Sequence, residues 1–168
     1  MGNRSPSHYP DIGVLGEDLV AQWLQSRGWV ILHRRWRCRW GELDIIALQE
    51  AGGCPLPALA FVEVKTRSHG NWDADGLLSI TPQKQGKLWQ TAKCFLATYP
   101  KLADYPCQFD VALVFCQRLS KNQYHNSDET LLTLESSASL SKTFQVGQAG
   151  NLVGYQLRLR EYIPSAFD

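Results

Sequence analysis

The residues best suited to chemistry in this sequence lie in the segment Phe61-Val62-Glu63-Val64-Lys65-Thr66-Arg67. Its β-branched residues and period of two predict a strand. Glu63 and Lys65 then share one face, roughly 6.6 Å apart along the strand, so their head groups can converge on one metal or phosphate. The same alternation is typical of an exposed strand face with weak ion pairs. The segment by itself therefore indicates either a reactive site or an ordinary solvated face.

The preceding segment, Gly41 to Leu48, favours the reactive site. There Asp44 interrupts an apolar run of the kind that a buried strand requires. Burying a lone carboxylate is costly unless a cation pairs with it. If the two strands are adjacent, Asp44 and Glu63 supply two carboxylates for a divalent metal, with the ammonium of Lys65 beside them.

A third acidic residue lies on a predicted helix over residues 12–27, in which Leu15, Leu19 and Trp23 recur at helical spacing. At 100° per residue Glu17 falls on the apolar side of this helix. Glu17 is either an edge carboxylate that reaches solvent or an arginine, or a third acidic group of the same site.

Arginines alternate with tryptophans between residues 34 and 40, after a strand that begins at Trp29. Guanidinium groups pair with phosphates, and indole rings stack on bases, so this pattern is typical of nucleic-acid binding. Arginine-rich strand edges also prevent edge-to-edge aggregation, and the sequence supports the two interpretations equally. The cluster consists of Arg34, Arg35, Trp36, Arg37, Arg39 and Trp40.

A second helix is predicted from Pro82 to about Tyr99, because Thr81-Pro82 has the form of an N-cap followed by proline at the first helical position. Gln83 and Lys84 lie in its first turn. Cations near a helix N-terminus oppose the helix dipole. Lys84 therefore has another purpose or is simply tolerated on a solvated face.

The remaining segments complete a single α/β domain over residues 12–168, preceded by a disordered tail over residues 1–11. A largely apolar strand is expected at 108–115 and a closing strand at 153–163, separated by a long polar insert at about 117–150. The order of elements predicts a central mixed β-sheet flanked by helices.

Composition narrows the location and the partners of the protein. The net charge of +1 means that affinity for nucleic acid must come from a local patch. The five cysteines are scattered and odd in number, so neither a disulfide framework nor a zinc site is indicated, and we expect reduced thiols in the cytosol. No apolar run resembles a signal peptide or a membrane span, which predicts a cytoplasmic protein with no membrane association.

The ordered set of motifs resembles the uncharacterised bacterial YraN family, over about residues 12–115 and the tail near Ala166-Phe167. This family is similar to archaeal-type Holliday-junction resolvases and belongs to the restriction-endonuclease-like superfamily, whose motif is written PD-(D/E)-x-K. The proline of that motif is absent here. The motifs are Gly13-x-x-Gly16-Glu17, Gly41-Glu42-Leu43-Asp44-Ile45-Ile46, Phe61-Val62-Glu63-Val64-Lys65-x-Arg67, Lys84 and Phe109-Asp110-Val111.

The resemblance implies a restriction-endonuclease-like fold and a site that binds Mg²⁺ or Mn²⁺. Asp44, Glu63 and the backbone carbonyl of Val64 would be the ligands, and Lys65 would orient or activate the attacking water. Glu17 would complete the acidic set, directly or through a metal-bound water. The remaining implied contacts are to nucleic acid, through Gln83 or Lys84 near the site and through Arg67, Arg34, Arg35, Arg37 and Arg39 at phosphates.

Three functions are consistent with these residues. The first is a metal-dependent endonuclease acting on branched or structured DNA, which as a junction resolvase would need two active sites and hence a homodimer. The second is a nucleic-acid-binding module with little or no catalytic activity of its own. The third is a scaffold in which the ionic cluster is structural.

Overall fold

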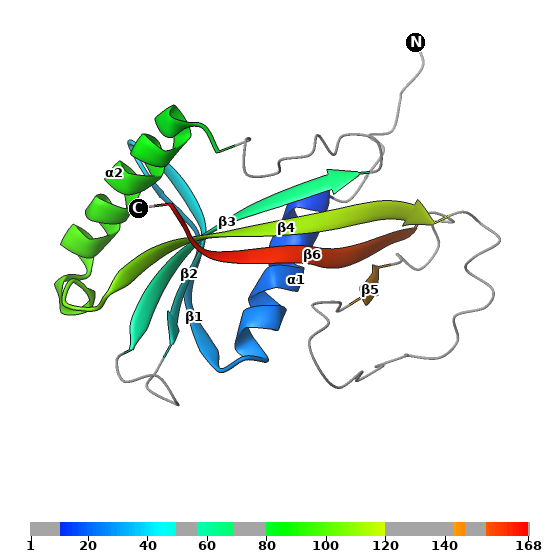
Figure 1. Cartoon of the computed structure of the whole chain (residues 1–168), viewed down its shortest axis with the longest axis horizontal. Helices are drawn as coiled ribbons and strands as arrows, with labels where there is room; N and C mark the ends of the chain where they lie inside the picture. Colours follow the sequence, from blue (N-terminus) through cyan, green and yellow to red (C-terminus); the bar gives the residue numbers. More distant parts are fainter. Residues whose placement is uncertain (1–10, 50–56, 69–79, 120–142, 147–153, 168) are drawn as a thin grey trace, which may run out of the picture.

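The computed structural model describes residues 11–49, 57–68, 80–119, 143–146 and 154–167. These residues form α-helices, a short 3₁₀ helix and strands of one sheet (Figure 1). In chain order the elements are α1 (Ile12–Gln25), β1 (Trp29–Cys38), β2 (Gly41–Gln49), β3 (Ala58–Ser68), α2 (Pro82–Thr98), η2 (Pro100–Leu102), β4 (Cys107–Leu119), β5 (Thr143–Val146) and β6 (Gly154–Phe167).

The sheet has the strand order β1-β2-β3-β4-β6-β5. All neighbouring strands are antiparallel except β3 and β4, which run parallel. The chain segment that joins this parallel pair contains α2, as a parallel connection requires. The structure therefore confirms the predicted α/β fold class, a restriction-endonuclease-like mixed sheet flanked by helices.

The two helices pack on opposite faces of the sheet, and each covers its own apolar cluster. Leu19, Val20 and Leu24 of α1 pack against the face that includes Val62 and Val64. On the other face the apolar residues of α2 join a second cluster, comprising Leu43, Ile46, Leu59, Phe61, Ile80, Leu88, Ala92, Phe95, Phe109, Val111 and Leu113. Successive residues of β3 thus contact different helices, as the period of two predicts.

The sheet forks between β2 and β3. Their pairing ends at Ile45 and Val62, whereas β1 and β2 stay paired to Cys38 and Gly41. On the other side, β3 and β4 stay paired to Ser68 and Cys116. In Figure 1 the β1–β2 end curls away behind α2 while β3 and β4 continue past α1. The fork separates two strands that both carry predicted site residues.

Several boundaries differ from the sequence predictions. The arginine cluster lies largely within β1 rather than after a shorter strand, because its backbone pairs with β2 through to the turn. Asp11, assigned above to the disordered tail, is the N-cap of α1 and its carboxylate accepts from the Gly13 backbone N–H at 2.9 Å. Residues 1–10 lie outside the described residues.

Most of the predicted insert at 117–150 also lies outside the described residues. Its described parts belong to the sheet: β4 continues to Leu119, and β5 forms the edge beside β6. The closing strand β6 runs to Phe167, four residues beyond the predicted end. Within the described residues, no helix combines the length and apolar content that crossing a membrane would require.

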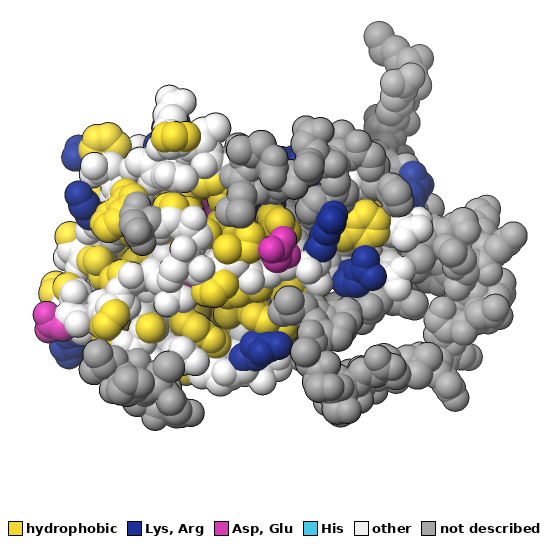
Figure 2. Space-filling model, viewed as in Figure 1, with side chains coloured by type: hydrophobic (Ala, Val, Ile, Leu, Met, Phe, Trp, Pro, Cys, Tyr) yellow, Lys and Arg dark blue, Asp and Glu magenta, His cyan; other side chains and the backbone are white. Residues whose placement is uncertain are grey.

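The surface around β4 and β6 is mixed in character. Among the side chains coloured by type in Figure 2, basic groups lie singly or in pairs between hydrophobic and neutral ones. This face therefore presents no continuous basic surface among its described residues. The arginine cluster at residues 34–39 lies on β1 and its turn, at the opposite edge of the sheet, whereas Arg67 lies at the end of β3.

Candidate functional site

The fork in the sheet positions Asp44 against β3. Beyond Ile45 and Val62 the β2–β3 ladder stops, and the backbone N–H of Val64 donates to Asp44 Oδ2 at 2.8 Å instead. A buried N–H must find an acceptor, and here the side chain of β2 replaces its backbone. The hydrogen bond holds the Asp44 carboxylate in the gap between the two strands.

Glu63 is the most buried carboxylate of the site, with 4% of its surface exposed. Its Oε1 lies 2.6 Å from Lys65 Nζ and 2.7 Å from Lys84 Nζ. Lys65 comes from the same face of β3, and Lys84 from the first turn of α2, where Thr81 caps the helix. The lysine at the helix N-terminus thus has a partner that offsets its unfavourable position in the helix dipole.

Burial and neighbouring acids make the ionised form of Asp44 unfavourable. Burial is the largest effect, and the nearby charge of Glu63 adds to it; together they raise the pKa of Asp44 to about 7, against the opposing effects of the Val64 N–H and Lys65. For Lys84, burial acts to lower the pKa, but the hydrogen bond and charge of Glu63 prevail and raise it. The site therefore holds a carboxylate that an added cation would stabilise, next to a lysine that stays charged.

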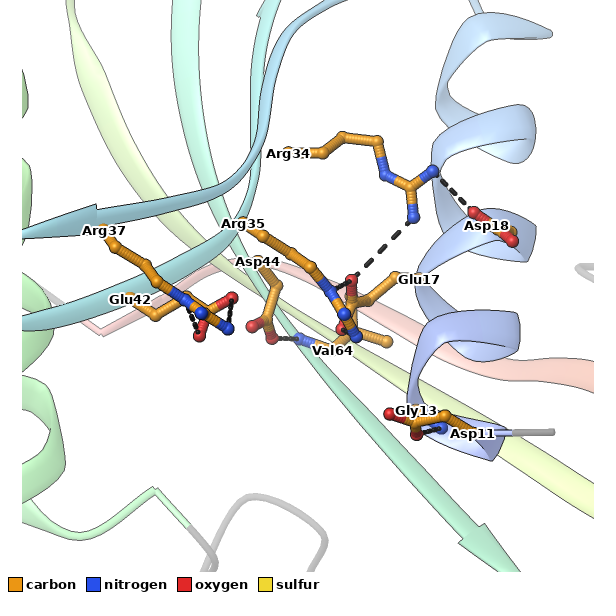
Figure 3. A network of polar contacts seen from close by, with 10 residues as sticks. All are labelled: Asp11, Gly13, Glu17, Asp18, Arg34, Arg35, Arg37, Glu42, Asp44 and Val64. Atoms are coloured by element: carbon orange, nitrogen blue, oxygen red, sulfur yellow. Dashed lines mark hydrogen bonds and ion pairs between the residues drawn. The ribbon is translucent and has the colours of Figure 1, made fainter. Parts of the chain in front are cut away.

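Glu17 meets an arginine at the same fork. Its Oε2 accepts from Arg35 Nε at 2.7 Å and its Oε1 from Arg35 Nη2 at 3.0 Å, while Arg34 Nη2 lies 3.8 Å away. Figure 3 shows Arg35 of β1 and Glu17 of α1 pointing toward one another beside Asp44 and Val64. The structure shows Glu17 paired with an arginine, and its place in the acidic set of the site stays a prediction.

A local backbone feature of β1 makes this contact possible. Arg35 has φ of 51°, in the left-handed region that only a few per cent of non-glycine residues adopt. Successive strand residues normally point to opposite faces, but this conformation lets Arg34 and Arg35 both reach α1. Arg34 pairs there with Asp18. Two consecutive arginines are thereby held by two consecutive acids.

Close approach of α1 to β3 brings Glu17 to the fork. A Cβ added at Gly16 would lie 1.9 Å from Thr66 Oγ1 and 3.2 Å from Thr66 Cβ. Glycine is thus the residue that permits this separation. The helix residue next to it, Glu17, is then carried to the fork, where its charge contributes to raising the pKa of Asp44.

The carboxylates at the fork supply some, but not all, of the oxygen ligands that a divalent cation such as Mg²⁺ requires. Asp44 and Glu63 offer carboxylate oxygens, and Mg²⁺ commonly binds one or two carboxylates and keeps several waters. Among the described residues, however, no group of three or more His, Cys, Asp or Glu side chains is placed to hold a metal ion. Both Glu17 oxygens are engaged by Arg35. A site for Mg²⁺ would therefore rest on two carboxylates, and a part for Glu17 through water stays a prediction.

The other predicted nucleic-acid contacts are distributed more widely. Arg37 forms a bidentate pair with Glu42, at 2.9 and 3.2 Å. Arg39 lies in the β1–β2 turn with its guanidinium 4.9 Å from the ring centroid of Trp40, which is 44% exposed. The two remaining predicted contacts, Arg67 and Gln83, are exposed at the end of β3 and the start of α2.

Sequence reasoning gave no role to a second acid in an apolar strand, Asp110. It is fully buried, and it accepts from Gln108 Nε2, from the Tyr162 hydroxyl at 2.6 Å and from the Ser165 backbone N–H at 2.9 Å. Burial, and then the charge of Asp110, raise the pKa of Tyr162. The signal in the sequence is the one used for Asp44, a carboxylate in an apolar run. This network is fully hydrogen-bonded and ties the end of β6 to β4.

The fold and site define an α/β protein of the restriction-endonuclease-like class, with an acid and lysine cluster at a fork in the sheet. The chain belongs to the uncharacterised protein family UPF0102, whose model matches residues 16–114. This confirms the family identified from the motifs.

Cyanobacterial members of the family are similar to this chain over almost its whole length. A UPF0102 protein of Trichodesmium erythraeum is 53% identical over 163 residues, covering 94% of this chain and 88% of the relative. One from Trichormus variabilis is 51% identical, covering 94% and 95%. One from Synechocystis is 45% identical, covering 94% and 97%. The similarity therefore extends beyond the matched segment to both flanking regions.

Proposed function

We propose that this protein is a metal-dependent endonuclease that hydrolyses phosphodiester bonds in branched or otherwise structured DNA. The observation that carries the proposal is the grouping at the fork: Asp44 with a pKa raised to about 7, Glu63 buried beside it, and two lysines on one oxygen of Glu63. A carboxyl whose pKa is raised by burial and a neighbouring charge is typical of functional sites, and a bound cation would offset the cost of ionising Asp44.

The chain's own residues would divide the work between binding and charge stabilisation. A bound Mg²⁺ or Mn²⁺ would supply Lewis acidity toward the phosphate and lower the pKa of bound water. Asp44, Glu63 and the Val64 carbonyl would hold that ion. Lys65 would orient the attacking water and stabilise the negative charge that develops on the phosphate oxygens.

Lys84 would place a second ammonium beside the same phosphate, from the N-terminus of α2. Backbone N–H groups at a helix N-terminus also favour an anion. The exposed Arg39 and Trp40 at the β1–β2 turn, and Arg67 at the end of β3, are the described groups best suited to contact the flanking nucleic acid. Gln83 would lie close to Lys84.

A second candidate is a nucleic-acid-binding module with little turnover of its own. It is favoured by the pairing of Glu17 with Arg35, and of Glu63 with Lys65 and Lys84, because both acids are already neutralised by cations of the protein. Binding of this kind would weaken steeply with salt and would not depend on the metal.

The test is a cleavage assay with Mg²⁺ and with Mn²⁺ on single-stranded, duplex, flap and four-way-junction DNA. Asp44→Ala is run in parallel, with Asp104→Ala, an exposed acid next to η2, as the matched control. We expect metal-dependent cutting by the wild type and by the control, and at least a hundredfold loss in Asp44→Ala with binding largely retained. Binding of the junction without cleavage would favour the second candidate. If the protein neither cuts nor binds any of these DNAs, the interpretation of the ionic cluster as structural is the one that remains.

A further inference from the structure

Two cysteines that are far apart in the sequence lie together in the fold. Cys38 ends β1 at the turn into β2, and Cys94 lies in the third quarter of α2. Cys38 pairs with Gly41 across the hairpin, and a Cβ added at Gly41 would lie 3.3 Å from Thr91 Oγ1, one helical turn before Cys94. The two elements are also packed together nearby, since the His33 and Trp36 rings of β1 contact Phe95 of α2, with centroids 5.4 Å apart in each case.

The surroundings of this pair differ from those of the other described cysteines. Both thiols are partly exposed, so a small oxidant can reach them, whereas Cys116 is buried. The Cys38 sulfur accepts from the Trp40 backbone N–H at 3.4 Å. Cys107 is exposed, but its sulfur donates to the backbone carbonyl of Tyr105 rather than facing a second thiol.

The local donors make the two thiols unequal. Burial acts to raise the pKa of Cys38, but the backbone N–H of Trp40, the thiol of Cys94, the backbone N–H of Gly41 and the Thr91 hydroxyl together lower it. The pKa of Cys94 is raised, by burial first and then by Cys38. Because the thiolate is the reactive form, Cys38 is the better nucleophile of the pair.

We propose that Cys38 and Cys94 form a dithiol site that a small-molecule disulfide oxidises to an intramolecular bridge. In the first step the Cys38 thiolate attacks one sulfur of the oxidant, forms a mixed disulfide and expels the other half as a thiolate. In the second step the Cys94 thiol gives its proton to solvent, and its sulfur attacks the Cys38 sulfur and expels the second half. Two protein thiols are oxidised, and one disulfide is reduced to two thiols.

The bridge would join the β1–β2 turn covalently to α2. It needs the two sulfurs to close to about 2.05 Å, and the packing of α2 against the end of β1 places the two side chains on facing elements. Because α2 also carries Lys84, which contacts Glu63, oxidation would fix the helix against the hairpin on one side of the fork. The dithiol site itself does not depend on the proposed nuclease function.

The test uses the full-length, fully reduced protein incubated under native conditions with glutathione disulfide. Remaining thiols are then alkylated in denaturant, and the chain is digested at acidic residues and mapped by mass spectrometry. We expect an intact mass lower by two hydrogen atoms before alkylation, and one linked peptide pair joining Cys38 to Cys94. Because the bridge is mapped in the wild type, this result does not depend on any variant folding.

Two variants assign the order of the steps, and a third serves as control. Cys94→Ser should accumulate the mixed disulfide on Cys38, whereas Cys38→Ser should react at least tenfold more slowly at position 94. Cys107→Ser should still form the bridge. The proposal is overturned if native oxidation gives glutathione adducts without a bridge, if the bridge joins any other pair, or if it forms only after unfolding.

Discussion

Replacement of Asp44 by asparagine should stabilise the protein at alkaline pH. Asparagine has nearly the same shape, and its side-chain oxygen can still accept the hydrogen bond from the Val64 N–H that Asp44 receives at 2.8 Å. The substitution therefore removes the charge and keeps the contact. It isolates the energetic cost of holding an ionised carboxylate at the fork.

The magnitude follows from the pKa of Asp44, which the fold raises from 3.8 to about 7. Between these two values the folded state binds more protons than the unfolded state, so the free energy of unfolding falls as pH rises. The contribution of the protonated Asp44 carboxyl to the free energy of unfolding is fully present below pH 3.8 and is lost as pH rises through about 7. A shift of about 3 units at 1.36 kcal/mol each gives about 4 kcal/mol.

The assay is urea unfolding of the wild type and Asp44→Asn at pH 5 and pH 8, with Asp104→Asn as the control for an exposed acid. We expect Asp44→Asn to be more stable than the wild type by about 4 kcal/mol at pH 8 and by about 2 kcal/mol at pH 5. Added Mg²⁺ should reduce the stability difference between Asp44→Asn and the wild type at pH 8. A cation that binds only the folded wild type stabilises it by about 2.7 kcal/mol when the cation concentration is a hundred times the Kd.

One result would refute this reasoning. If Asp44→Asn were less stable than the wild type by the same amount at both pH values, the carboxylate would be a structural partner rather than a strained one. The scaffold interpretation of the ionic cluster would then replace the metal site. If Mg²⁺ left the stability difference at pH 8 unchanged, the result would count against metal binding. The raised pKa of Asp44 would still explain the difference itself.

Three further substitutions test the supporting contacts, each by urea unfolding. Gly16→Ala should lower the free energy of unfolding by about 1–3 kcal/mol through overpacking. Most of this loss should disappear in a Thr66→Ala background, because the added methyl group meets the Thr66 side chain. If the loss were undiminished there, the strain would lie elsewhere. Tyr162→Phe should cost about 1.5–3 kcal/mol, since its hydroxyl donates to the buried carboxylate of Asp110, and should leave DNA cleavage unchanged. Arg37→Ala, whose side chain is 69% exposed, should cost less than about 1 kcal/mol, and a larger loss would mean that its ion pair is part of the fork.

Local patterns in the sequence were sufficient to predict the main elements and the fold class. The helix beginning at Ile12, the strand centred on Glu63 and the helix beginning at Pro82 all lie within a few residues of their predicted places. Periodicity and capping act over a few residues, so a single sequence contains them. Asp44 and Glu17 were identified in the same way, as acids on faces that should be apolar, and both lie at the fork.

The partners of those acids were decided by contacts between distant segments. Glu17 pairs with Arg35 because of a left-handed residue in β1, which the sequence does not mark with glycine. Cys38 lies near Cys94 only because α2 packs against β1.

The sequence by itself determined which residues carry charge into the core and which strand and helix hold them. The tertiary structure decided where the sheet forks, and so which cation meets which carboxylate. The physical reason is that alternation is a property of one strand, whereas the end of a ladder depends on how two strands twist apart around the helices packed on either face. At this fork, the backbone N–H of Val64 loses its ladder partner and binds Asp44 instead.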